Sequence, residues 1–222
     1  MKIRLSTFIA LTGFCLTIGY SQDSDRFAKW EEKIANFEKR DKESPPPKGC
    51  LLFVGSSSIR MWDLEGSWPD EDTVNNGFGG STIADSIHFF DRVIAPYQPR
   101  AVILYTGDND INKGLSAEGT LQDFDTLSGK IRSKFPSVPI LFLAIKPSRK
   151  RWEIWPEMKK ANDLIAKRCS EEKNMVFVDT ASAMLKGNAG PPNEKWFVED
   201  GLHLSEYGYQ VWTGMVSQAL AE

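Results

Sequence analysis

The sequence predicts an α/β fold in which a parallel β-sheet is covered by helices on both sides. Short apolar runs alternate with longer amphipathic stretches along most of the chain. The short runs are apolar at nearly every position, as in strands that are buried on both faces, and such strands are typical of parallel sheets. A chain of 222 residues is long enough for one well-buried domain.

We expect strands where the short apolar runs lie, at residues 51–54, 73–76, 101–105, 140–144 and 175–178. The run at 101–105, Ala-Val-Ile-Leu-Tyr, is the strongest of these predictions, and the run at 73–76 is the weakest. Between them the chain has the strand–helix alternation from which parallel sheets are built.

Helices are expected at residues 26–42, 83–95, 117–135, 155–169 and 206–220. In the first of these, Phe27, Trp30, Ile34 and Phe37 recur at helical spacing. Three consecutive prolines then end the N-terminal segment before the first strand.

The first residues have the layout of a secretory signal peptide. Lys2 and Arg4 precede an apolar run that is too short to span a bilayer comfortably, and small and polar residues follow it. We expect cleavage near Ser21, export to the periplasm or the exterior, and no stable membrane insertion of the mature chain. An uncleaved N-terminal anchor is the alternative.

The net charge and the cysteine content give only limited information about function. The net charge is −3, which does not suggest the basic face of a nucleic-acid-binding protein. Cys50 and Cys169 remain after the leader. Two buried free thiols are expected, although the sequence does not decide whether the cysteines pair. It does not indicate an oligomeric state either.

Polar residues follow the predicted strands at the edge where ligands bind in parallel α/β folds. The segments Gly-Ser-Ser-Ser-Ile, Asn-Asn-Gly-Phe-Gly-Gly and Gly-Asp-Asn-Asp follow the first three strands, and Asp-Gly-Leu-His follows the last strand after a long loop. Acyl transfer requires a nucleophile, a base with its orienting carboxylate, and hydrogen-bond donors for the oxyanion. Serine, an Asp/His pair, glycine-rich backbone and an asparagine amide fit these requirements.

These four segments resemble, in order, the four sequence blocks of the SGNH, or GDSL-type, hydrolases. The resemblance covers roughly Cys50 to the end. It implies a flavodoxin-like three-layer α/β/α sandwich with five parallel strands in the order 2-1-3-4-5. It also implies a serine ester hydrolase that needs no metal or other cofactor. The expected organisation is a signal peptide at 1–21, an N-terminal helix with a Pro-rich connector at 22–48, and the hydrolase domain at 49–222.

Site residues follow from the resemblance position by position. Ser57 matches the nucleophile, and Asp200 and His203 match the carboxylate and the base. The oxyanion donors would be the backbone N–H groups of Ser57 and Gly80 and the side-chain amide of Asn109.

The first block departs from the family pattern at one position. The aspartate that normally precedes the nucleophile is Ser56 here, so three serines stand in a row. Ser57 has the offset from Gly55 that fits the pattern, whereas Ser56 or Ser58 is expected to serve as a turn or helix-cap residue.

A metal centre is disfavoured because catalytic zinc usually has several histidine ligands, and His203 is the only histidine among these candidate site residues.

The expected substrate is a short acyl ester, either an acetylated carbohydrate or a lysophospholipid, because the chain has no obvious long lid. Four tryptophans on loops after the strands are candidates for the rim of the site, at positions Trp62, Trp68, Trp152 and Trp155. The alternatives are an acyltransferase or thioesterase with the same triad, and a catalytically silent glycan-binding domain.

Overall fold

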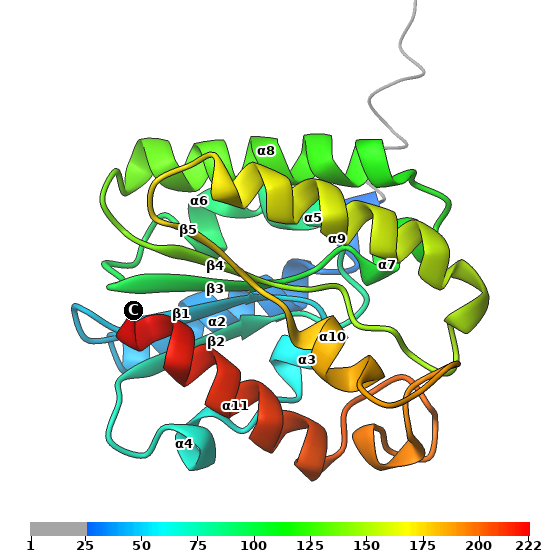
Figure 1. Cartoon of the computed structure of the whole chain (residues 1–222). Helices are drawn as coiled ribbons and strands as arrows, with labels where there is room; N and C mark the ends of the chain where they lie inside the picture. The colour runs from blue at the N-terminus through cyan, green and yellow to red at the C-terminus, as the bar shows by residue number, and fades with distance from the viewer. Residues whose placement is uncertain (1–25) are drawn as a thin grey trace, which may run out of the picture.

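The computed structural model describes residues 26–222, and the predicted signal peptide lies outside them. A single parallel sheet forms the centre of the molecule, with strand order β2-β1-β3-β4-β5, which confirms the predicted topology (Figure 1). The strands lie close to their expected positions, at Leu51–Gly55 (β1), Thr73–Gly77 (β2), Ala101–Tyr105 (β3), Ile140–Leu143 (β4) and Met175–Val178 (β5).

Helices cover both faces of the sheet (Figure 1). One face carries α2 (Glu31–Glu43), α5 (Ile83–His88), α6 (Phe90–Val93), α8 (Ala117–Lys134) and α9 (Trp155–Ser170). The other face carries α3 (Ser57–Arg60), α4 (Leu64–Ser67), α10 (Thr180–Leu185) and α11 (Glu206–Ala221). A further short helix, α7 (Asp108–Asn112), follows β3.

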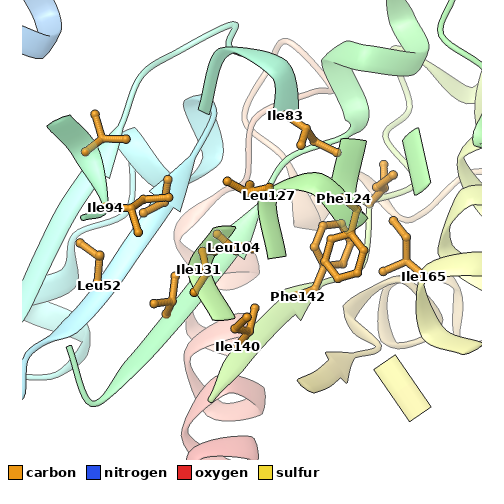
Figure 2. Close-up of a cluster of buried hydrophobic side chains, with 14 of the residues drawn as sticks. Leu52, Ile83, Ile94, Leu104, Phe124, Leu127, Ile131, Ile140, Phe142 and Ile165 are labelled. Carbon is orange, nitrogen blue, oxygen red and sulfur yellow. The ribbon is translucent and has the colours of Figure 1, made fainter. Parts of the chain in front are cut away.

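The buried side chains form two hydrophobic clusters, one on each face of the sheet, because successive side chains of a strand point to opposite faces. In β1, Leu52 joins the cluster beneath α8 and α9, and Phe53 joins the cluster beneath α11. Figure 2 shows the first cluster, where Phe124 of α8 packs edge-on against Phe142 of β4. Cys50 and Cys169 are buried in this cluster as free thiols.

The register aligns the carboxyl ends of three strands. Gly55 pairs with Gly77 on one side and with Tyr105 on the other, so the segments after β1, β2 and β3 emerge together. Gly55 has φ +148°, and a Cβ there would lie 1.9 Å from the carbonyl oxygen of Tyr105. Only glycine permits this close approach at the point where the chain leaves the sheet.

The predicted helix at 83–95 is divided. Phe89 ends α5 and precedes α6, with φ −88° and ψ 12°, outside helical geometry. Its buried ring packs edge-on against Phe27 and Phe78, so tertiary packing overrides a continuous helix here. The first predicted helix also differs, because the continuous α2 begins at Glu31.

Helix α2 packs against the layer of helices that covers this face of the sheet. Ile34 and Phe37 are buried in the hydrophobic cluster shared with α6. At its surface, Arg92 of α6 forms ion pairs with Glu31 and Glu38, at 2.6 and 2.7 Å. These contacts hold α2 against the body of the protein. In the described part of the chain, no helix is long and apolar enough to cross a membrane.

Candidate active site

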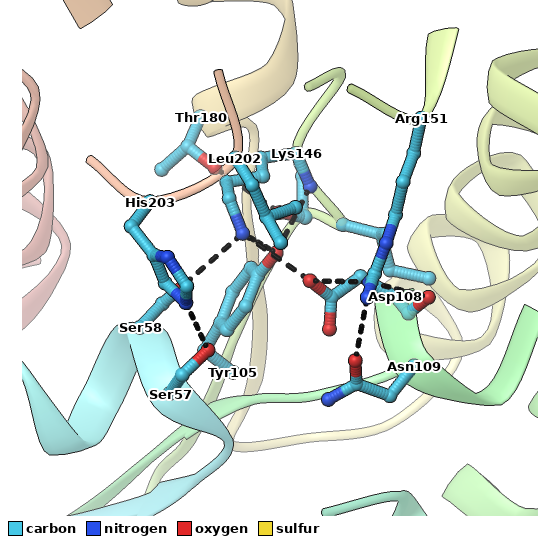
Figure 3. Close-up of polar contacts among 12 residues, drawn as sticks. Ser57, Ser58, Tyr105, Asp108, Asn109, Lys146, Arg151, Thr180, Leu202 and His203 are labelled. Atoms are coloured by element: carbon cyan, nitrogen blue, oxygen red, sulfur yellow. Dashed lines mark hydrogen bonds and ion pairs between the residues drawn. The ribbon is translucent and has the colours of Figure 1, made fainter. Parts of the chain in front are cut away.

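Ser57 stands at the start of helix α3, immediately after β1 and Ser56. This junction places the serine at the carboxyl edge of the sheet, where the strand ends converge. The hydroxyl of Ser57 lies 3.0 Å from Nε2 of His203, which reaches it from the loop before α11 (Figure 3).

A compact turn joins His203 to its carboxylate. Nδ1 of His203 lies 2.5 Å from Oδ2 of Asp200, while the other carboxylate oxygen accepts the backbone N–H groups of Leu202 and His203. Gly201 has φ +65°, a conformation that favours glycine and lets the turn close over three residues. The structure therefore brings together the three residues that the sequence predicted for the triad.

The environment of Asp200 favours its ionised form. Partial desolvation raises the pKa of this carboxyl, but hydrogen bonds from the His203 backbone and imidazole and from the Leu202 backbone outweigh it and lower the pKa to about 2. The imidazole therefore has an ionised carboxylate on Nδ1, which keeps Nε2 directed at the serine.

The three consecutive serines occupy different environments. Ser56 is fully buried and its hydroxyl has no partner among the described residues. The hydroxyl of Ser58 is also buried and accepts a hydrogen bond from Lys146 at 3.0 Å. Within the described part of the chain, Ser57 is the only one of the three that is hydrogen-bonded to the imidazole.

The predicted oxyanion donors lie beside Ser57 on the same open cleft, which has a volume of about 610 Å³ and is lined by Ser57, Gly80, Asn109 and His203 among others. Gly80 has φ +80°, in a turn that other residues would strain to adopt. The backbone N–H groups of Ser57 and Gly80 donate to no other residue between 26 and 222. They are therefore free to bind a ligand oxygen.

Two partners orient the side-chain amide of Asn109. Its Nδ2 donates to the carbonyl oxygen of Ser81 at 2.9 Å. Its Oδ1 accepts from the guanidinium of Arg151 at 3.0 Å, as Figure 3 shows. A flipped amide would lose both bonds. This arrangement leaves the second N–H of Nδ2 as an available donor.

Arg151 is itself held by a buried charged cluster (Figure 3). It donates to the Asp108 carbonyl at 3.0 Å and lies 3.3 Å from the Asp108 carboxylate. The ammonium of Lys146 contacts the same carboxylate at 3.2 Å and the hydroxyl of Tyr105 at 2.9 Å. Burial alone would raise the pKa of Asp108, but the two cations hold it below its usual range.

Sequence reasoning assigned neither Lys146 nor Arg151 to the site. A usable signal was present, because Lys146 follows the fourth strand at the same sheet edge as the other site residues. The lysine is nevertheless 1% exposed, and no residue pattern indicates that a lysine will be buried.

The expectation for the tryptophans needs correction. Trp62 and Trp68 are buried in the core, where their indole N–H groups donate to Thr213 and Ser217 of α11. Trp155 is buried in the other cluster, and Trp152 stacks on it rather than lining the cleft. The tryptophan that does line the cleft is Trp30, just before α2.

The two aspartates that follow β3, Asp108 and Asp110, have protein partners. Asp108 contacts the two cations described above, and Asp110 accepts the backbone N–H of Ile83 at 2.9 Å. Within residues 26–222, no group of three potential ligands is arranged to hold a metal ion.

Comparison with solved structures identifies the same fold in proteins of low sequence identity. A structure from Streptococcus pneumonia, named for platelet activating factor, has a TM-score of 0.77 at 21% identity and covers 93% of this chain and 100% of its own. A GDSL-like lipase from Bacteroides thetaiotaomicron has a TM-score of 0.68 at 18% identity, covering 85% and 98%. A carbohydrate esterase family 3 protein from Talaromyces cellulolyticus has a TM-score of 0.64 at 18% identity, covering 78% and 96%.

The sequence comparisons agree with the fold. No curated protein matches the chain. Residues 60–211 match the GDSL-like Lipase/Acylhydrolase family, a range that includes Gly80, Asn109, Asp200 and His203. The chain therefore belongs to the GDSL-like lipase/acylhydrolase family of ester-bond hydrolases.

Proposed function

We propose that this protein is an exported serine carboxylester hydrolase that cleaves short acyl esters through a covalent acyl-enzyme on Ser57. The observation that carries the proposal is the continuous contact from Asp200 through His203 to the hydroxyl of Ser57. Export is proposed from the signal-peptide pattern of the first residues.

In the first step, Ser57 Oγ attacks the ester carbonyl carbon while Nε2 of His203 takes the hydroxyl proton. The carbonyl π electrons move to the oxygen and form a tetrahedral oxyanion. When this intermediate collapses, the bond to the leaving oxygen breaks and His203 returns the proton to it. The products are a free alcohol and an acyl group esterified to Ser57.

In the second step, water attacks the acyl-enzyme and gives its proton to Nε2 of His203. Collapse of the new tetrahedral intermediate expels the Ser57 oxygen, which takes the proton back from the imidazole. A carboxylic acid leaves, and the enzyme returns to its starting state. Asp200 stabilises the imidazolium in both steps without accepting its proton.

Stabilisation of the oxyanion is assigned to the N–H groups of Ser57 and Gly80 and to the amide of Asn109. Loss of one such donor typically slows the reaction by about 100- to 1,000-fold. Because Arg151 and the Ser81 carbonyl already orient Asn109, its amide needs no rearrangement when charge develops on the substrate.

The substrate is proposed to be an ester of a small acyl group, on an acetylated carbohydrate or a lysophospholipid. The cleft of about 610 Å³ is large enough for a sugar-sized alcohol next to Ser57. Trp30 lines this cleft and offers an aromatic surface to such a group.

The test is hydrolysis of p-nitrophenyl acetate, butyrate and octanoate by the mature protein, with and without a chelator. We expect chelator-insensitive turnover that is fastest with acetate and is lost in Ser57→Ala. Ser56→Ala is the matched control and should retain activity, since its hydroxyl does not contact His203. Full activity in Ser57→Ala would overturn the assignment of the nucleophile, and chelator-sensitive turnover would overturn the metal-free mechanism.

A further inference from the structure

Three cationic side chains without a carboxylate partner line the proposed catalytic cleft. Lys29, Lys33 and Arg60 all border it, and none forms an ion pair with another residue in the described range 26–222. Some cations elsewhere on the surface, such as Lys160, are paired with glutamates, and others, such as Lys42 and Lys195, have no ion-pair partner among the described residues. The three cations in question differ from these in that they border the same cleft as Ser57, where substrate would bind.

Arg60 lies next to the proposed oxyanion donors. It follows Ser57 by three residues in α3, and a Cβ built on Gly79 would lie 2.9 Å from its Nε. Its guanidinium thus lies over the backbone of Gly79, beside Gly80. No hydrogen bond joins this guanidinium to another residue that the structure describes, so its donors remain available to a ligand.

The two lysines come from the N-terminal segment and are held in place with it. The ammonium of Lys29 lies 4.8 Å from the centre of the Trp30 ring, and that of Lys33 lies 5.1 Å from the Phe37 ring. Helix α2 is itself anchored by the buried side chain of Ile34 and by Arg92. This wall of the cleft precedes the range that matches the family.

The carboxylates of the cleft do not cancel this charge. Asp108 is compensated by Lys146 and Arg151. The remaining acidic residues are Glu32 on the wall and Asp200 behind His203, against three cations without an ion-pair partner among the described residues. The cleft is therefore electropositive although the whole chain has a net charge of −3. An electropositive cleft concentrates anionic ligands and raises their rate of association.

We propose that the preferred substrate is a short acyl ester whose alcohol portion carries an anionic group, a carboxylate or a phosphate. This inference rests on the proposed function, because it assigns the substrate of the same site. The acyl group occupies the space beside Ser57 and Gly80, and the anionic group of the alcohol meets Arg60 and the lysines of the N-terminal wall. A guanidinium binds both carboxylate and phosphate oxygens well.

The test uses three acetyl esters of nearly equal size, those of 3-hydroxybenzoate, 3-hydroxybenzamide and 3-hydroxyphenyltrimethylammonium. Each kcat/KM is divided by the rate of alkaline hydrolysis of the same ester, which removes differences in leaving-group reactivity. We expect the order anionic, neutral, cationic, with the anionic ester preferred about tenfold over the neutral one at low salt. High ionic strength should reduce this preference toward one.

Single substitutions test which side chains produce the preference for the anionic ester. Arg60→Gln and Lys33→Gln should each reduce the anionic-over-neutral ratio about two- to fivefold, the range expected for one partly exposed charge. Lys42→Gln is the matched control, because Lys42 is an exposed lysine of the same helix outside the cleft. Arg60→Lys preserves the charge and should retain most of the ratio, which also covers the case in which Arg60→Gln fails to fold.

Inhibition of neutral-ester hydrolysis by benzoate and by phenyl phosphate shows which anion fits better. A wild-type ratio near one at low salt, with the neutral ester still hydrolysed in a Ser57-dependent manner, would overturn this inference alone. An equal loss of the ratio in Lys42→Gln would overturn the assignment to the cleft. Failure to hydrolyse any of the esters would instead contradict the proposed function.

Discussion

Two charged assemblies flank Ser57, and they differ in exposure and in how the chain builds them. The Asp200–His203 turn is formed within four residues, and the Asp200 side chain is 37% exposed. The cluster of Lys146, Asp108 and Arg151 joins segments about forty residues apart, and its Lys146 side chain is 1% exposed. We infer that the exposed turn transfers protons, whereas the buried cluster holds Asn109 in place.

This difference has a physical reason. A group that gains and loses a proton in each cycle must tolerate both charge states, which partial exposure to water allows. A permanently charged scaffold can be buried, provided that each ion has its partners, and it then resists rearrangement. Variants in the turn should therefore affect rate, and variants in the cluster should affect stability first.

The largest expected effect on rate is in the turn. Asp200→Asn should lower kcat by about 10,000-fold, because the amide cannot stabilise the imidazolium or hold the same tautomer. The free energy of unfolding should change by less than about 1 kcal/mol, as is usual for partly exposed pairs. Ester hydrolysis and urea unfolding of the same preparation measure both quantities. A large loss of stability with little loss of rate would show that the turn is structural and contradict its proposed role in proton transfer.

In the buried cluster, Lys146→Met should destabilise the protein by about 3–5 kcal/mol. Removal of one partner leaves the buried Asp108 carboxylate with Arg151 as its remaining cation. Lys159→Met provides the control, since it breaks an exposed pair with Asp163 and should cost less than about 1 kcal/mol. The two urea midpoints should differ clearly. Similar midpoints would show that the buried cluster contributes no more than a surface pair.

Arg151 connects the cluster to the proposed oxyanion donors, so its variants should affect kcat more than KM. Arg151→Gln should lower kcat about 10- to 100-fold, because the Asn109 amide loses the donor that orients it. Arg151→Lys should recover part of this loss. Steady-state kinetics separates the two parameters. An increase in KM alone would show that Arg151 binds substrate and does not position Asn109.

Asp110 is also buried near Asp108, but it has no cationic partner among the described residues. Burial raises its pKa to about 7, and the Asp108 charge adds to this effect. The folded state therefore binds a proton more tightly than the unfolded state. The resulting stabilisation is complete below about pH 4 and is lost as pH rises through about 7.

Asp110→Asn removes this titration. Between pH 4 and 8, the wild type should lose about 4 kcal/mol of stability relative to the variant, because a carboxyl pKa raised from about 4 to about 7 corresponds to about three pKa units. Urea unfolding at several pH values measures the difference. A difference that does not change with pH would mean that Asp110 titrates normally in the folded protein.

The sheet could be predicted because its strands are short apolar runs. A continuous apolar run directly reflects burial on both faces of the strand. The proposed triad could be identified because its residues stand in ordered blocks at strand ends. The break at Phe89, the burial of Trp62 and Trp68, and the position of Trp30 could not be predicted. Each of these depends on which distant side chains fill the space around an aromatic ring.

The sequence by itself determined the fold class, the strand order through its family resemblance, and the set of residues that meet at one edge of the sheet. Only the tertiary structure decided that Lys146 and Arg151 enclose Asp108 and that α2 forms a wall of the cleft. Local patterns record burial and turns, because these depend on neighbouring residues. The pairing of buried charges depends on distances between segments far apart in the chain, which only the packed fold sets.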